Sequence, residues 1–254
     1  MAGAAWLVTT GFAPTFLADE DPARRVSLGG ACKGCDLTRG NLKGAKFKTC
    51  NFANAKLSGM DLRGAKLVAA NFAGAEMSRA DMTEVQITAA NLSDVNIMGA
   101  AMAQADITGS NFSGSKGTGA RFEGADITGT TFAKATLLGS QFAQADLVGV
   151  TFHQAQLNGA DFSNADLKGV SFHKAQMSGV NFSDSRLEGV NFYKATLDGV
   201  DFAGSDWTEV NLSDADLSNV QNLSMSQVRN ACGTPETRLP ATLRAQGVRV
   251  KRCR

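Results

Sequence analysis

The sequence lacks the features that would place it among membrane proteins or several common enzyme classes. Its longest apolar stretch, residues 1–18, is interrupted by Pro14 and is too short to cross a bilayer as a helix. The glycine-rich run at 115–119 lacks the Lys-Ser/Thr ending and the following helix of a phosphate-binding loop. The Cys-x-x-Cys motif at 32–35 has no βαβ pattern around it, which argues against a thioredoxin-like redox role.

What the sequence does contain is a five-residue period. From Leu37 to Leu217 every position ending in 2 or 7 carries a bulky apolar residue except Gly117, and the residue two positions earlier is usually small. On an α-helix, residues five apart would spiral round all faces, and in a plain strand they would alternate between two sides. The period therefore predicts short extended pieces separated by bends, often at glycine, with the bulky and small residues pointing inward.

A longer period of 20 residues is visible in the second half: from Phe112 to Phe202 positions ending in 2 are all phenylalanine, and those ending in 7 are mostly Leu, Ile or Met. Four pentads then make one square coil. About nine such coils, stacked at about 4.8 Å, give a rod of roughly 45 Å with a one-dimensional core. The predicted core columns consist of Phe112, Phe122, Phe132, Phe142, Phe152, Phe162, Phe172, Phe182, Phe192 and Phe202.

These pentads resemble the pentapeptide-repeat family, whose pattern is A(D/N)LxG in outline. The residues that carry the resemblance are Ala105-Asp106-Ile107-Thr108-Gly109 and Ala165-Asp166-Leu167-Lys168-Gly169. The resemblance implies an all-β fold, a right-handed quadrilateral parallel β-helix. It implies much less about function, because one fold hosts unrelated roles.

The ends of the chain depart from the repeat. Residues 1–18 look like the hydrophobic region of a secretory signal, although an apolar segment that covers the first coil is the alternative. Residues 19–31 then form an N-terminal cap or linker, and 32–220 form the solenoid. We expect a periplasmic or secreted protein if the leader is a signal, and a cytoplasmic one otherwise.

Residues 221–254 are expected to form a C-terminal cap with a basic tail. Ser224-Met225-Ser226-Gln227 matches a capping box, and Gly233 fits a helix stop, so a short helix is predicted over about 225–231. Its expected role is to cover the open end of the core. Residues 241–254 are expected to be mobile.

Five cysteines flank or enter the repeat. If the chain is exported, disulfides Cys32–Cys35 and Cys232–Cys253 are expected to staple the two ends. Free or buried thiols are the alternative, above all for Cys50. A zinc site is disfavoured, because Cys50 offers at most one further ligand near Cys32 and Cys35.

The net charge of +1 hides a segregation along the chain. Residues 31–70 have a net charge of +6, residues 151–220 of −6 and residues 221–254 of +6. Solvated outer faces explain this pattern, and a basic tail lying against the acidic last coils is the alternative. The candidate interaction face is acidic and comprises Asp161, Asp201, Asp206, Glu209, Asp214 and Asp216.

Two local features break the regularity. His153, His173 and Tyr193 lie one coil apart from each other and should form an exposed column, for which we expect ordinary polar surface rather than a metal site. Gly117 leaves one inward position empty between Ile97 and Leu137, which predicts a local cavity or a kink.

The sequence predicts a non-enzymatic structural or protein-interaction rod with an unknown protein partner. Inward positions are apolar and outward carboxylates stand singly in water, so no catalytic residue, small-molecule substrate, cofactor or metal is expected. The alternative comes from the family: a cytoplasmic DNA mimic that protects a type II topoisomerase such as gyrase. A third interpretation, nucleic-acid binding by the basic first coils, is disfavoured because no aromatic residues are interleaved on their exposed faces. A monomer or an end-to-end dimer is expected.

Overall fold

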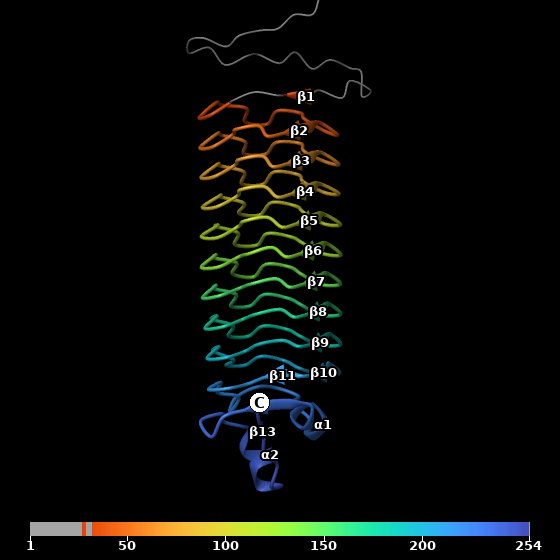
Figure 1. The fold of residues 1–254 in the computed structure, drawn as a ribbon, viewed down its shortest axis with the longest axis vertical. Helices are drawn as coiled ribbons and strands as arrows, with labels where there is room; N and C mark the ends of the chain where they lie inside the picture. Colours follow the sequence, from red (N-terminus) through yellow and green to blue (C-terminus); the bar gives the residue numbers. More distant parts are fainter. Residues whose placement is uncertain (1–26, 29–31, 254) are drawn as a thin grey trace, which may run out of the picture.

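In the computed structural model, which describes residues 27–28 and 32–253, the chain forms an elongated stack of coils that ends in a small helical cap (Figure 1). One side of the stack is a ten-stranded parallel sheet in which β1 to β10 follow each other in sequence order. From β2 onward each strand pairs with residues 20 positions away, as Phe47 does with Leu67. The predicted quadrilateral parallel β-helix is therefore confirmed.

The other three sides of each coil are joined by single parallel bridges, also 20 residues apart. We call the side built by β1 to β10 the sheet face, and the next side, with Asn91 opposite Asn111, the asparagine face. The third side contains the bridge Asn96 to Lys116, and the fourth contains Ala101 to Arg121. Because every side keeps the same register, one column of outward side chains follows each position in the coil.

The strands of the sheet face are only two or three residues long, since each pentad ends in a corner. The middle residue of each three-residue strand is buried and its neighbours point outward. The strands are β1 (Ser27–Leu28), β2 (Lys46–Lys48), β3 (Lys66–Val68), β4 (Gln86–Thr88), β5 (Asp106–Thr108), β6 (Asp126–Thr128), β7 (Asp146–Val148), β8 (Asp166–Lys168), β9 (Arg186–Glu188) and β10 (Asp206–Thr208).

β1 shows that the sheet begins before residue 32, where the repeat pattern starts. Ser27 and Leu28 pair with Lys46 and Phe47 of β2, so part of the segment expected to be a cap or linker is the first strand of the sheet. The expected leader, residues 1–18, lies outside the described residues, as does most of 19–31.

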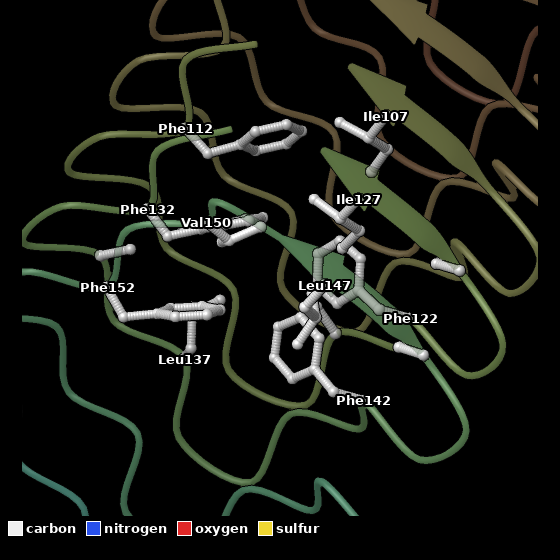
Figure 2. Close-up of a cluster of buried hydrophobic side chains, with 14 of the residues drawn as sticks. Ile107, Phe112, Phe122, Ile127, Phe132, Leu137, Phe142, Leu147, Val150 and Phe152 are labelled. Carbon is white, nitrogen blue, oxygen red and sulfur yellow. The ribbon is translucent and has the colours of Figure 1, made fainter. Parts of the chain in front are cut away.

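The core is a pair of phenylalanine columns that meet inside the rod (Figure 2). Rings one coil apart stack nearly parallel, as Phe132 does on Phe152 with ring centroids 5.2 Å apart. Rings from the two columns meet edge to face, as Phe142 meets Phe152 at 5.7 Å. Both arrangements are favourable for aromatic quadrupoles. All ten phenylalanines from Phe112 to Phe202 are fully buried.

The corners adopt the left-handed backbone conformation. Gly149 has φ +63°, but Lys134 and Lys194 take the same conformation with φ near +59° and +56°. A non-glycine residue loses roughly 1–2 kcal/mol in this region relative to the right-handed one. Inward burial of the bulky residue in each pentad offsets that loss, so glycine is frequent at the corners without being required at each one.

Gly117 does not leave the cavity that the sequence predicts. A Cβ atom at this position would lie 2.7 Å from Cδ2 of Leu137 and 3.3 Å from two carbons of Ile97. The side chains one coil above and below therefore occupy the space. The backbone also continues without a break, because Lys116 bridges both Asn96 and Thr136. The cavity prediction was wrong because both neighbours are long and flexible enough to fill the gap.

We expect Gly117→Leu, which restores the repeat pattern, to destabilise the protein by about 1–3 kcal/mol, because the inserted side chain must displace Leu137 and Ile97 from a filled core. Denaturant unfolding measures the change. Met77→Leu, a change of similar volume in the same core, is the control and should shift stability by less than about 1.5 kcal/mol. A stabilised Gly117→Leu variant would show that the gap is open.

The cap begins where the repeat register ends. Helix α1 (Met225–Arg229) starts at the predicted capping box: the backbone N–H of Gln227 donates to Ser224 Oγ, and the N–H of Ser224 donates to Gln227 Oε1. The helix is shorter than predicted. It ends at Arg229, because Ala231 to Gly233 form strand β12 (Ala231–Gly233) in place of the expected helix stop.

The remainder of the chain folds onto this cap, so the expectation of a mobile tail was wrong for the described residues. Strands β11 (Val210–Asn211), β12 and β13 (Lys251–Arg252) form a second parallel sheet, and helix α2 (Ala241–Ala245) lies between β12 and β13 in the sequence. Apolar side chains anchor the segment in a small second core. Its members are Val228, Leu239 and Leu243, packed against Leu223, Val248 and Val250.

Disulfides close both ends of the described chain. Cys32 is bonded to Cys35 at the first full coil, and Cys232 of β12 is bonded to Cys253, the residue after β13. Cys50 is buried, and its Sγ donates to the carbonyl of Lys48. The pairing of the four other cysteines corresponds to the two staples expected for an exported chain.

Candidate interaction surface

The sheet face carries a column of charged side chains that changes sign along the rod. Lys46 and Lys66 pair with each other on β2 and β3, and Gln86 separates them from the acidic part. Four aspartates then follow in consecutive coils, and each pairs with the next: Asp106, Asp126, Asp146 and Asp166. We call these four residues the acidic ladder.

The acidic ladder is an unfavourable arrangement that the fold imposes. Strand spacing places neighbouring carboxylates about 4.8 Å apart at the backbone, so each inner aspartate has two like charges beside it. Partial burial, followed by the charges of Asp166 and Asp126, raises the pKa of Asp146 above its ordinary value. Of the four ladder aspartates, only Asp166 has an ion pair with a described residue, with Arg186 Nη1 at 3.2 Å.

We expect Asp146→Asn to raise the free energy of unfolding at pH 7 by about 0.2–1 kcal/mol, because it removes two like-charge contacts. The raised folded-state pKa means that ionisation of Asp146 destabilises the fold, and this effect is relieved as the pH falls through that pKa. The difference between variant and parent should therefore vanish at acidic pH, as measured by denaturant unfolding at several pH values.

Asp206→Asn is the matched control, because its neighbour in the same column is Arg186 rather than an aspartate. This change should leave stability unchanged or lower it. An equal gain from both substitutions would mean that net charge, and not the ladder, determines the effect.

The family assignment follows from two sequence models that together span the solenoid. The model for pentapeptide repeats in eight copies matches residues 32–67, 61–102 and 96–132, and the model for a pentapeptide repeat region matches 117–192 and 145–222. Together they cover well over half of the chain. The chain belongs to the pentapeptide-repeat family.

Solved structures of other pentapeptide-repeat proteins share this fold. HetL from the cyanobacterium Nostoc, which is involved in the regulation of heterocyst differentiation, is 24% identical with a TM-score of 0.54, and the alignment covers 75% of this chain and 86% of HetL. QnrB1, a plasmid-mediated fluoroquinolone resistance protein, is 24% identical with a TM-score of 0.62 over 71% of this chain and 89% of its own. No curated protein sequence matches this chain.

The acidic residues predicted to form the interaction face do not lie on one side of this pentapeptide-repeat protein. Asp161 and Asp201 lie on the fourth side, Asp206 lies on the sheet face and Asp216 lies on the third side. Glu209 and Asp214 occupy corners with positive φ. Residues that are near in sequence are distributed round the rod, because five residues turn the chain by one side.

Three of these six residues instead attach the cap. Asp214 Oδ1 accepts from Thr234 Oγ1 at 2.7 Å, Asp216 Oδ2 lies 3.3 Å from Arg238 Nη1, and Asp201 Oδ1 accepts from Asn222 Nδ2 at 2.7 Å. The basic C-terminal segment therefore does contact the acidic last coils. Apolar packing and strand pairing also hold it there, so charge is one contribution among several.

The histidine column lies on the asparagine face. The rings of His153 and His173 are 4.7 Å apart, those of His173 and Tyr193 are 5.0 Å apart, and Lys194 Nζ lies over the Tyr193 ring. Partial burial and the nearby charges of His153, Lys174 and Lys194 lower the pKa of His173. The described residues contain no group of three or more His, Cys, Asp or Glu side chains suited to a metal ion.

The basic first coils are partly neutralised. Arg63 forms ion pairs with Asp61 and Asp81, and Lys56 forms one with Asp36. Within the described residues, no helix has the length and hydropathy needed to span a membrane.

Sequence reasoning missed the acidic ladder as a surface feature, although its signal is present. The triplet Ala-Asp-Ile or Ala-Asp-Leu recurs at 105–107, 125–127, 145–147 and 165–167, and its 20-residue spacing equals one coil. Grouping acidic residues by segment obscured this column. Grouping them by position in the coil reveals it.

Proposed function

We propose that this protein is an exported, non-enzymatic rod that binds a protein partner through its sheet face. The observation that carries the proposal is the acidic ladder: four carboxylates in register on a flat, rigid surface, three of them without an ion pair among the described residues. Each isolated surface carboxylate would contribute little to binding. A column with fixed spacing selects for a partner with a complementary row of basic side chains.

Several features support the non-enzymatic part of the proposal. The residues that point into the solenoid are apolar except for a few buried serines and Thr130, and no carboxylate, histidine or lysine is buried among the described residues, so the described core holds no acid–base pair that could exchange a proton. Pentapeptide-repeat proteins are generally structural or protein-interaction solenoids. The two cavities described lie at the C-terminal end of the rod, the second of them beside Thr208 of β10, and neither is lined by the acidic ladder.

Export is supported by the two cysteine pairs, because disulfides persist in oxidising compartments. The intact mass of the protein made with its leader in a Gram-negative host tests this part. A chain that begins near residue 19 and is lighter by two hydrogens for each cysteine pair supports export. A full-length, fully reduced chain would contradict it.

The partner surface is tested by photo-crosslinking in the producing cell. A crosslinker at Thr128 projects from the sheet face beside the ladder, whereas one at Ser178 projects from the third side. We expect an adduct with a distinct protein from Thr128 only, which is lost when Asp106, Asp126 and Asp146 are changed to Asn. Changing Glu84, Glu209 and Glu236 to Gln removes the same charge elsewhere and should leave the adduct in place.

Adducts that form equally from both positions, or that survive neutralisation of the ladder, would refute the proposed surface. A catalytic activity that copurifies with the folded chain and is lost on its unfolding would refute the non-enzymatic part.

The alternative function, protection of a type II topoisomerase by DNA mimicry, would use the same acidic ladder. Duplex DNA carries one negative charge per about 1.7 Å of its axis, whereas the ladder has one carboxylate per coil of about 4.8 Å. Lys46 and Lys66 also make one end of the face basic. An absence of any effect on gyrase supercoiling at micromolar protein would eliminate this alternative.

A further inference from the structure

The C-terminal cap contains a cavity that the repeat pattern does not predict, since its walls come from residues after the repeat ends. Its volume is about 500 Å³. Three arginines line it, from three successive parts of the cap: Arg244 in α2, Arg249 in the following loop and Arg252 in β13. A volume of this size accommodates a small organic ligand.

The charge in this cavity is uncompensated. No aspartate or glutamate is among the lining residues, and none of the three arginines forms an ion pair within the described part of the chain. Arg238, also in the cap, differs from them because it is paired with Asp216. Three exposed guanidinium groups around one hollow repel each other unless an anion lies between them.

The other polar groups of the lining are already engaged. Thr237 Oγ1 donates to the carbonyl of Leu212, and Thr234 Oγ1 donates to Asp214. The arginines are therefore the side-chain donors available to a ligand. Leu239 is almost fully buried, and Val248 and Val250 are half-buried, so part of the lining is apolar.

We propose that this cavity binds a small phosphate-bearing anion with more than one negative charge. Guanidinium groups form two parallel hydrogen bonds with phosphate or carboxylate oxygens. Arginines approaching from three parts of the cap fit tetrahedral phosphate oxygens, which point in several directions, better than the two coplanar oxygens of a carboxylate. The apolar part of the lining would accept an organic group attached to the phosphate.

The Cys232–Cys253 disulfide makes this site dependent on oxidation. β13 has only two residues, it contains Arg252, and the next residue is Cys253, bonded to β12. Reduction leaves β13 held only by noncovalent contacts: its pairing with Cys232 and Gly233 of β12 and the packing of the preceding Val250 in the second core. Binding should therefore weaken when the disulfide is reduced, in accord with a site that operates in an oxidising compartment.

Calorimetric titration of the full-length oxidised protein tests the proposal, with pyrophosphate, inorganic phosphate and citrate as probes at low salt. We expect pyrophosphate to bind most tightly, and Arg244→Gln with Arg249→Gln to weaken it at least about tenfold. Arg229→Gln removes an exposed arginine of α1 that does not line the cavity and should change the affinity by less than about twofold. Circular dichroism of each variant establishes that the cap remains folded.

Vesicles with and without an anionic phospholipid distinguish a lipid headgroup from a free phosphate compound. Cosedimentation that depends on Arg244 and Arg249, without binding of free pyrophosphate, assigns the site to a headgroup. Equal losses in the Arg229 variant and the cavity variant would show general attraction to a basic segment and overturn the proposal. Citrate binding as tightly as pyrophosphate, or no binding of any probe, would overturn it as well. None of these outcomes depends on the sheet face, so the proposed function is judged separately.

Discussion

Replacing Phe152 by alanine should destabilise the rod by about 3–5 kcal/mol and lower its melting temperature by roughly 10 °C. The ring of Phe152 is fully buried and stacks on Phe132 and Phe172, both at 5.2 Å. It also meets Phe142 and Phe162 edge to face. Truncation removes four aromatic contacts and leaves a cavity whose backbone walls are held by the coils above and below.

Position in the rod should influence this result. In a solenoid each coil contacts only its neighbours, so a defect in the middle uncouples two halves, whereas a defect near an end frays a short segment. Hydrogen exchange should therefore show faster opening on both sides of coil 151–170 in the Phe152→Ala variant. Phe52→Ala, close to the N-terminal end, should accelerate exchange mainly in the first coils.

Phe152→Leu is the matched control, because Leu92 occupies the same column naturally and is fully buried there. This variant should retain most of the stability. Equal losses from leucine and alanine would mean that specific ring stacking, rather than filled volume, holds the column together. A loss below about 1 kcal/mol from alanine would mean that the coils can collapse around a missing ring.

The fold could be predicted from the sequence because the solenoid is one-dimensional. A single rule, that every fifth residue points inward, determines each side of each coil, and no distant part of the chain competes with it. The phenylalanine columns follow from the same rule. The packing around Gly117 could not be predicted in this way. It depends on whether Leu137 and Ile97 can move into the space, and the periodicity of the sequence carries no information about that.

Surface and cap were harder to predict for different physical reasons. The acidic ladder depends on the 20-residue register, so residues 106 and 166 share a column although they are 60 positions apart. By contrast, Asp214 and Asp216 are close in sequence but lie on different parts of the rod. The cap has no repeat. Its second core and its arginine-lined cavity depend on tertiary contacts among residues 223–253, and its second sheet also needs β11 of the last coil.

Gln227 explains how the cap ends the solenoid. In each coil a backbone N–H donates to a carbonyl of the previous coil, as Asp206 N–H donates to Ser185 at 2.9 Å. By this register the carbonyl of Ser205 would accept from residue 226, which lies in α1 instead. The side-chain amide of Gln227 takes that place and donates to the carbonyls of Ser205 and Phe202 at 2.9 and 2.8 Å.

We therefore expect Gln227→Met, which keeps the volume and removes the amide, to destabilise the cap by about 1–3 kcal/mol, because the carbonyl of Ser205 is left unpaired whereas that of Phe202 still accepts from Ser205. The same change removes the acceptor for the N–H of Ser224, so the capping box of α1 is lost as well. Limited proteolysis between β10 and β12 should become faster. Size-exclusion chromatography should show concentration-dependent association, because a displaced cap exposes the apolar last coil at an open end.

Gln246→Met makes the same chemical change at the exposed end of α2 and should alter neither measurement. If the Gln227→Met variant associates while its α1 helix stays protected from proteolysis, the loss of hydrogen bonds to the carbonyls is not the cause of the exposed last coil. If neither measurement changes, the strand pairing, the apolar contacts of Val228 and Leu243 and the Cys232–Cys253 disulfide hold the cap without the amide. The side-chain amide of Gln227 would then contribute volume but no required hydrogen bond. The last coil would be covered by apolar contact with the cap, as each earlier coil is covered by the coil that follows it.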